Sequence, residues 1–172
     1  MEHNEKVNAA KKIHERARYY RGRFLNSVAV IERDIAMILT DYFCTKDEEK
    51  RELFFRNIAT APSFSLKTKK DILVKIVKKD YPIYWDNNSD VLRHFEEIIE
   101  FRNKLAHSIV DVSDEALKRP IEDGIGFVEW QEGKPITQED FDDLDAWATT
   151  VNSCLNDIRR LLPYKQTRAT QK

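Results

Sequence analysis

The sequence has little glycine, proline or cysteine. Its 172 residues include 4 Gly, 5 Pro and 2 Cys, whereas 41% are hydrophobic and 34% are charged. Few chain breakers and an ordinary apolar content are typical of one globular, mostly helical domain, and they argue against a disordered chain or a β-protein with many turns. We expect a single helical domain over residues 1–163 and a disordered polar tail over residues 164–172.

Long apolar runs and a segment of the signal-peptide type are also lacking. No stretch of about 18 uncharged apolar residues occurs, so no membrane-spanning helix and no membrane partner are expected. The N-terminal segment contains no apolar block of the length that a signal peptide needs. Cys44 and Cys154 stand far apart in apolar helical segments, which favours two reduced core thiols over a disulfide. These features predict a cytoplasmic protein.

Several sequence motifs of well-known chemistry are missing. The formal net charge of −1 argues against a strongly cationic surface that coats nucleic acid, although it allows a local basic groove. No GxxxxGK[ST], GxGxxG, HExxH, CxxC or GxSxG pattern occurs. The acidic run at 140–145 lies where a helix is expected to begin, and the helix dipole accounts for it better than a bound cation does. We therefore expect no cofactor and no metal, and any chemistry must use histidine and cationic side chains.

Apolar residues at helical spacing predict five helices, over about residues 5–43, 47–59, 66–79, 89–107 and 138–162. The segment 80–88 contains a proline and two asparagines, so it is expected to be a loop, with Ser89 as the N-cap of the fourth helix. Segments 126–130 and 134–137 flank a glycine and are expected to form a hairpin. The predicted fold is all-α: an antiparallel four- to five-helix bundle with a small β-hairpin inserted before the last helix.

The stretch FRNKLAHS (101–108) contains the strongest candidate site. Arg102 and Asn103 stand together near the end of an apolar-rich helix, and His107 follows four residues after Asn103. An arginine and a histidine at such a spacing are expected about once by chance, so the weight rests on the fuller string, with a polar residue after the arginine and Leu-Ala before the histidine. Histidine moves protons near neutral pH, and arginine holds phosphate oxygens with its planar fork. The residue types suit cleavage of a phosphodiester.

This string resembles the signature of HEPN domains, a family of small helical bundles that includes metal-independent ribonucleases and toxins of host-defence and toxin–antitoxin systems. The resemblance covers the motif closely and residues 5–162 in architecture. It implies a metal-independent endoribonuclease in which Arg102 clamps the phosphate, His107 is the general acid/base and Asn103 orients them.

The same resemblance implies partners. These are an RNA substrate, a second copy of the chain in a homodimer whose sites draw on both subunits, and an antitoxin or another neighbour-encoded protein. Some HEPN toxins carry a tyrosine two residues after the histidine, which an antitoxin modifies. Ile109 occupies that position here, so neutralisation of that kind is not expected.

Helix geometry leaves the pairing of the motif residues open. Five residues of α-helix turn through about 500°, so Arg102 and His107 should point about 140° apart, whereas Asn103 and His107 share a face. Either the helix loosens near His107, or two copies of the motif face each other across a dimer cleft. In the rival interpretation the three residues only close a packed helix, and the chain is a non-catalytic HEPN-like adaptor or a nucleotide- or protein-binding module.

Other residues offer RNA contacts, but each has a simpler structural explanation. The lysines of 67–79 and the arginines of 16–23 either bind phosphates or form solvated helix faces. The aromatic residues Tyr81, Tyr84 and Trp85 either stack on bases or fold back onto the core. Glu32 either orients Arg102 or is an ordinary surface carboxylate, and His94 is expected at the surface.

Overall fold

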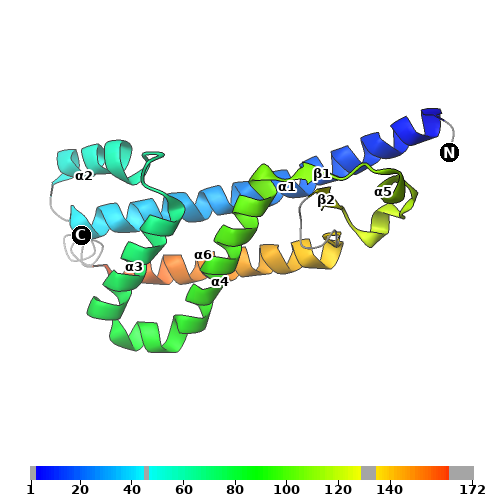
Figure 1. Ribbon diagram of the computed structural model, residues 1–172. Coiled ribbons are helices and arrows are strands. Elements are labelled where there is room, and N and C mark those ends of the chain that lie inside the picture. The colour runs from blue at the N-terminus through cyan, green and yellow to red at the C-terminus, as the bar shows by residue number, and fades with distance from the viewer. Residues whose placement is uncertain (1–2, 45–46, 129–134, 163–172) are drawn as a thin grey trace, which may run out of the picture. The chain divides into compact units, whose positions relative to one another are not determined.

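The computed structural model describes residues 3–44, 47–128 and 135–162. The chain is mostly helical, and it divides into two compact units that comprise residues 1–27 with 100–146, and residues 28–99 with 147–172. Three long helices contribute to both units: α1 (His3–Phe43), α4 (Pro82–His107) and α6 (Gln138–Leu161) (Figure 1). The predicted tail at 164–172 lies outside the described residues.

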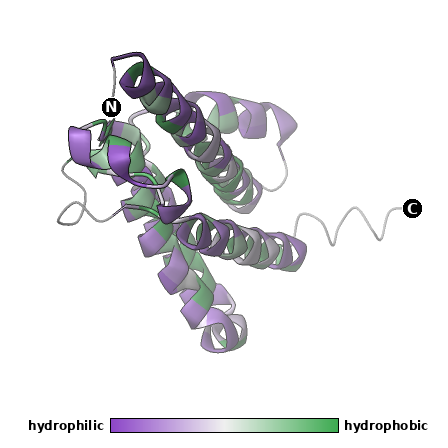
Figure 2. Ribbon diagram, turned by 90° about the vertical axis from the view of Figure 1, so that its right-hand side faces the viewer, coloured by the Kyte–Doolittle hydropathy of each residue, from purple (hydrophilic) through white to green (hydrophobic). Residues whose placement is uncertain are grey.

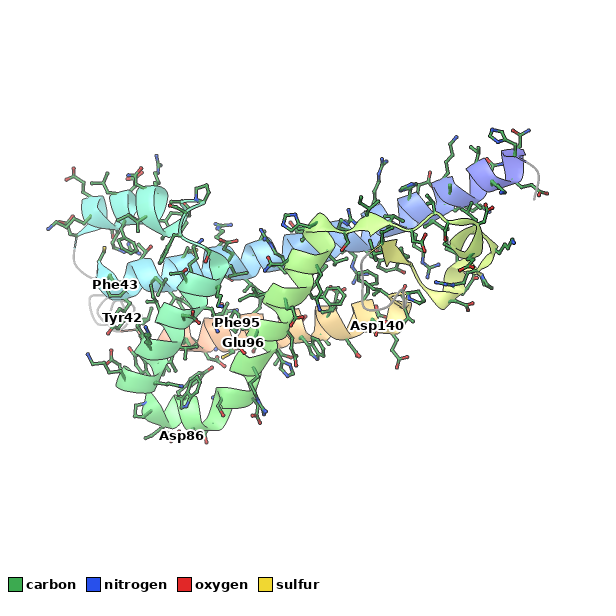
Figure 3. All side chains as sticks on the ribbon, viewed as in Figure 1. Tyr42, Phe43, Asp86, Phe95, Glu96 and Asp140 are labelled. Carbon is green, nitrogen blue, oxygen red and sulfur yellow. The ribbon has the colours of Figure 1, made fainter. Side chains whose placement is uncertain are left out.

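Helices α1 and α6 confirm the predictions made from apolar spacing. Along α1 the residues that recur every three or four positions are buried: Phe24, Val28, Ile31, Ile35 and Ile38. Helix α6 begins with a reciprocal cap, in which the Asp140 amide donates to Thr137 Oγ1 (3.2 Å) and Asp140 Oδ2 accepts from the Thr137 amide (2.7 Å). Figure 3 labels Asp140 at this end of the helix. Hydrophilic and hydrophobic residues alternate along the long helices (Figure 2), as one-sided burial requires.

The first unit contains a two-stranded antiparallel sheet. Strand β1 (Ile109–Val110) follows α4 directly and pairs with β2 (Phe127–Val128), and the short helices α5 (Asp114–Lys118) and η2 (Ile121–Asp123) lie between the two strands in the sequence. The predicted hairpin is only partly represented: Ile125 and Ile136 form an isolated antiparallel bridge, and residues 129–134 lie outside the described residues. The strand that follows α4 is therefore the partner of β2.

The second unit contains two shorter helical segments. Helix α2 (Glu48–Phe54) is capped by Asp47, which accepts from the Lys50 amide at 3.0 Å, and it continues as the π-helix η1 (Phe55–Ala59). Helix α3 (Leu66–Asp80) is capped by Ser65, whose Oγ accepts from the Thr68 amide at 3.2 Å. These bounds agree with the predictions of helices at 47–59 and 66–79.

The predicted loop at 80–88 is wrong, and so is Ser89 as an N-cap. Helix α4 begins at Pro82 and runs through both positions to His107. Proline fits the first turn of a helix because its missing amide hydrogen has no acceptor there. Asn88 donates through Nδ2 to the Tyr84 carbonyl at 2.9 Å, so this asparagine is accommodated within the helix. Pro82 therefore starts a helix here instead of interrupting the chain.

Two glycines of the first unit give a stability prediction with opposite signs. Gly124 has φ +111°, and an added Cβ would lie 2.6 Å from the Ile136 carbonyl oxygen; at Gly22, within α1, an added Cβ meets nothing within 4 Å. We expect Gly124→Ala to lower the free energy of unfolding by about 1–3 kcal/mol through backbone strain. Gly22→Ala should raise it by about 0.5–1 kcal/mol through helix propensity. Urea unfolding of both variants beside the wild type measures this, and a shift of the same sign in both would contradict the assigned conformations.

Candidate functional site

Packing of the last two turns of α4 decides which motif residues face outward. Leu105 is completely buried, and the Phe101 ring meets the edge of Phe24 at 5.4 Å and of Phe141 at 6.4 Å between centroids. This inward face turns the opposite side of the helix to solvent, where Asn103 and His107 are both exposed. Packing of Phe101 and Leu105 against the protein therefore fixes the outward direction of the polar side chains.

Two of the three motif residues are in contact. Arg102, which is half-buried, donates through Nη1 to Asn103 Oδ1 at 2.9 Å. Among the described residues, the side chain of His107 forms no hydrogen bond and no ion pair. His94 on the same helix differs, because its Nδ1 lies 2.9 Å from Glu97 Oε2 and its ring stacks on Trp147 at 5.3 Å. The structure thus joins Arg102 to Asn103 and leaves the imidazole of His107 open to a ligand.

Helix α4 keeps its helical hydrogen bonding up to the motif histidine. The Ser108 amide donates to the Lys104 carbonyl at 2.9 Å, and Ser108 Oγ donates to the same oxygen at 2.6 Å. The expected alternative of a helix that loosens near His107 is therefore wrong. On a regular helix the side chains of Arg102 and His107 leave about 140° apart, so a single chain does not direct both at one small group.

An arginine of α1 fixes the end of the motif helix. Arg21 donates through Nη2 to the Ser108 carbonyl at 2.8 Å, and its guanidinium lies 5.3 Å from the centre of the Phe127 ring. A cation at a helix C-terminus satisfies a free carbonyl and complements the helix dipole. Burial lowers the pKa of the Arg21 guanidinium. The sequence alone indicates Arg21 only as one of four arginines on a helix face, because its partner Ser108 is distant in the chain.

The lysine-rich helix α3 is not a uniform basic face. The side chain of Lys69 is 2% exposed and donates to Glu32 Oε1 at 2.5 Å, whereas Lys70 is 8% exposed and donates to Glu96 Oε1 at 2.9 Å (Glu96 is labelled in Figure 3). Both lysines lie on the buried stripe of the helix with Leu66 and Leu73, at three- and four-residue spacing. Neither of the two expected roles, phosphate binding or a solvated face, fits these two lysines.

The remaining candidates are engaged within the second unit. Glu32 accepts from Lys69, so its carboxylate has a partner other than Arg102. The tyrosine hydroxyls donate to helix α6, Tyr84 to the Cys154 carbonyl at 3.2 Å and Tyr81 to the Leu161 carbonyl at 3.4 Å. Lys78 Nζ lies 4.3 Å from the centre of a Trp85 ring. These aromatic residues fold back onto the protein, which leaves base stacking by them without support.

A pocket of about 570 Å³ lies in the second unit between α1 and α2. Its wall includes Asp41, Glu48, Glu49, Arg51 and Phe55. Asp41, only 3% exposed, forms ion pairs with Arg51 and with Arg159, whose Nε lies 3.6 Å from Asp41 Oδ2. Arg51 also pairs with Glu48 at 3.0 Å. The wall also contains Arg33 and Glu52, so four carboxylates stand against two arginines, and the pocket lacks the cationic lining that a phosphate ligand requires.

Comparisons with known proteins add no further site, and the described residues contain no metal-binding cluster and no helix suited to a membrane. No family model, no curated protein and no solved structure matches the chain. Among residues 3–44, 47–128 and 135–162, no group of three or more His, Cys, Asp or Glu side chains is placed to hold a metal ion. In the same residues, no helix combines the length and the apolar character that crossing a membrane requires. Cys44 and Cys154 are free thiols, and burial raises the pKa of Cys154.

Proposed function

We propose that this protein is a HEPN-like, metal-independent endoribonuclease that acts as a homodimer. The observation that carries the proposal is the exposed imidazole of His107, which lies on one helix face with Asn103 and has no polar partner among the described residues. Asn103 in turn holds the guanidinium of Arg102. A histidine that only closed a packed helix would be expected to make a structural contact, as His94 does with Glu97.

The chemistry uses groups that the motif supplies. The His107 imidazole accepts the proton of the ribose 2′-hydroxyl while the 2′-oxygen bonds to phosphorus. The bond from phosphorus to the 5′-oxygen breaks, and that oxygen takes a proton from water, so the products are a 2′,3′-cyclic phosphate and a 5′-hydroxyl. Arg102 stays charged and stabilises the negative charge that grows on the phosphate oxygens. Asn103 orients the guanidinium through the hydrogen bond to Asn103 Oδ1.

A dimer would bring an arginine and a histidine of the motif to the same phosphate, which one chain does not do. Within one regular helix, Arg102 and His107 point about 140° apart, so one phosphate does not meet both. In a two-fold symmetric dimer the same surface faces itself, and His107 of one chain lies opposite Arg102 of the other. Two equivalent sites then form in one cleft, each with an imidazole and a guanidinium from different subunits.

Purified wild-type protein is expected to cleave single-stranded RNA in the presence of EDTA. The 2′-hydroxyl is the nucleophile, so the 3′ ends should carry 2′,3′-cyclic phosphate, and an RNA with 2′-O-methyl groups throughout should stay intact. Gel analysis of end-labelled RNA and mass spectrometry of the fragments measure both features. Cleavage that depends on an added divalent cation, or that leaves 3′-hydroxyl ends, would contradict the proposed chemistry.

A second candidate is a non-catalytic protein-binding module. Large apolar side chains are exposed around α2 and the end of α1: Phe43 (54%, labelled in Figure 3), Leu53 (55%) and Ile58 (50%). Exposed apolar groups of this kind favour a protein partner, such as an antitoxin or another neighbour-encoded protein. If the purified protein leaves RNA intact and forms a stoichiometric complex with such a partner, this function replaces the first.

A further inference from the structure

A pocket of about 300 Å³ in the first unit adjoins the end of the motif helix. One wall comes from α1, with His14, Ala17, Arg18 and Arg21, and the other from residues 108–110, which include Ser108 and strand β1. In Figure 1 this is where the blue part of α1 meets the green end of α4 and β1. The volume is at the lower end of the range for small-ligand sites, which suits one phosphate group with part of a nucleotide.

The charges in this pocket have one sign. Its lining residues include two arginines and a histidine but no carboxylate. Among the described residues, the side chains of His14 and Arg18 form no hydrogen bond and no ion pair. Arg21 bonds the Ser108 carbonyl and lies over the Phe127 ring, and its Nε is buried without a hydrogen-bond partner. A part-buried guanidinium that contacts a carbonyl and a ring but no anion still lacks charge compensation.

The neighbouring arginines Arg16 and Arg23 of α1 do not line this pocket. Arg23 forms an ion pair with Asp145, and Arg16 lies over the Tyr20 ring at 5.5 Å. His14, Arg18 and Arg21 are spaced four and three residues apart, so α1 presents them on one face toward the pocket. Three cationic or proton-binding side chains on one helix face, without acidic neighbours in the lining, are suited to a multiply bonded anion.

We propose that this pocket binds a backbone phosphate of single-stranded RNA, and that this phosphate neighbours the one cleaved at His107. The position next to the cleaved phosphate rests on the proposed function, whereas phosphate binding itself rests on the pocket alone. Ser108, which lines the pocket, follows His107 directly, and adjacent Cα atoms lie about 3.8 Å apart. A strand held in the pocket therefore passes close to the backbone of His107, and in this proposal the pocket sets the register of the substrate.

The test measures binding separately from cleavage. A fluorescent, single-stranded 2′-O-methyl RNA cannot be cut by 2′-oxygen attack, so its anisotropy reports binding to the full-length protein at several salt concentrations. We expect Arg18→Gln to weaken binding about tenfold. The slope of log K against log salt should fall by about 0.7, the value for one lost phosphate contact to a single strand. Arg18 is exposed and has no partner among the described residues, so its loss should leave folding intact.

The matched control is Arg16→Gln, which removes the same charge two residues away on α1. Its affinity should stay within about twofold of the wild type, because Arg16 does not line the pocket. Equal losses in the two variants, or a wild-type protein that does not bind this RNA, would overturn the inference. Competition with inorganic phosphate and with AMP identifies the ligand. If binding of phosphate and AMP requires Arg18 but binding of the RNA does not, the assignment to RNA is overturned.

The same variants separate this inference from the ribonuclease function. If Arg18→Gln weakens binding of the methylated RNA but wild-type protein cuts no unmodified RNA, the phosphate pocket stands and the catalytic proposal falls. If the wild type cleaves RNA and Arg18→Gln cleaves it with unchanged kcat/KM, the pocket proposal falls and the catalytic one stands. We expect Arg18→Gln to raise KM and to leave kcat unchanged, because Arg18 binds the substrate without contacting the reacting atoms.

Discussion

Replacement of His107 by alanine is expected to lower kcat/KM for RNA cleavage by about 10²–10⁴-fold. That range is the usual contribution of a positioned general acid or base. The side chain is exposed and makes no polar contact among the described residues, so its removal should leave the free energy of unfolding almost unchanged. Initial rates in EDTA and urea unfolding of the same preparation measure the two quantities.

The control for this variant is His94→Ala on the same helix. His94 lies beside Glu97 and Trp147 in the second unit and is not part of the proposed site, so its loss should leave the rate within about twofold. Arg102→Ala should cost about 10²–10³-fold, as expected for loss of one electrostatic contact to the transition state. If His107→Ala cleaves RNA at the wild-type rate, the assignment of the general acid/base is wrong.

Mixing the two inactive variants tests whether each site draws on both chains. In a mixed dimer, the Arg102→Ala chain supplies His107 and the His107→Ala chain supplies Arg102, so one of the two composite sites is complete. With free subunit exchange, half of the dimers are mixed, and about a quarter of the wild-type rate should return. A mixture of Arg102→Ala with the double variant offers no complete site and should stay inactive. Failure of the first mixture to recover would mean that each chain uses only its own pair.

The parts of the fold that were predictable from sequence are those in which local pattern and packing agree. Helix α1 keeps its apolar stripe from Phe24 to Ile38, and the Thr137–Asp140 pair marks the start of α6. The start of α4 was missed because Pro82 can either interrupt a chain or begin a helix, and local sequence does not decide which. The pairing of β1 with β2 joins residues far apart in the sequence, and two-residue strands carry too short a pattern to reveal it.

In the candidate site too, local sequence spacing predicts some features, and contacts between distant residues decide others. The outward direction of Asn103 and His107 follows from the spacing to Phe101 and Leu105, and sequence alone indicated the shared face. The burial of Lys69 and Lys70 was not predicted, although both fall on the stripe that contains Leu66 and Leu73. The role of Arg21 was not readable, because only the folded chain brings its guanidinium to the Ser108 carbonyl.

Asp41→Ala is expected to lower the free energy of unfolding by about 3–5 kcal/mol, the usual cost of removing one member of a buried ion pair. The Asp41 side chain is 4% exposed, while those of Arg51 and Arg159 are 19% and 26% exposed. The Nε atoms of both arginines are buried without a hydrogen-bond partner, so neither guanidinium is fully solvated once the carboxylate is gone. Urea unfolding followed by circular dichroism measures the change.

The control for Asp41→Ala is Asp90→Ala, because Asp90 is 80% exposed and pairs with Arg93 at the surface, where an ion pair contributes at most about 1 kcal/mol.

A double-mutant cycle separates the energy of the Asp41–Arg51 ion pair from the effect of losing either side chain alone. In the Asp41→Ala background, Arg51→Ala should cost much less than in the wild type, because the guanidinium has already lost its buried partner. Equal costs of Arg51→Ala in both backgrounds would mean that Asp41 and Arg51 do not stabilise each other. The carboxylate would then contribute through its pairing with Arg159 or through packing alone.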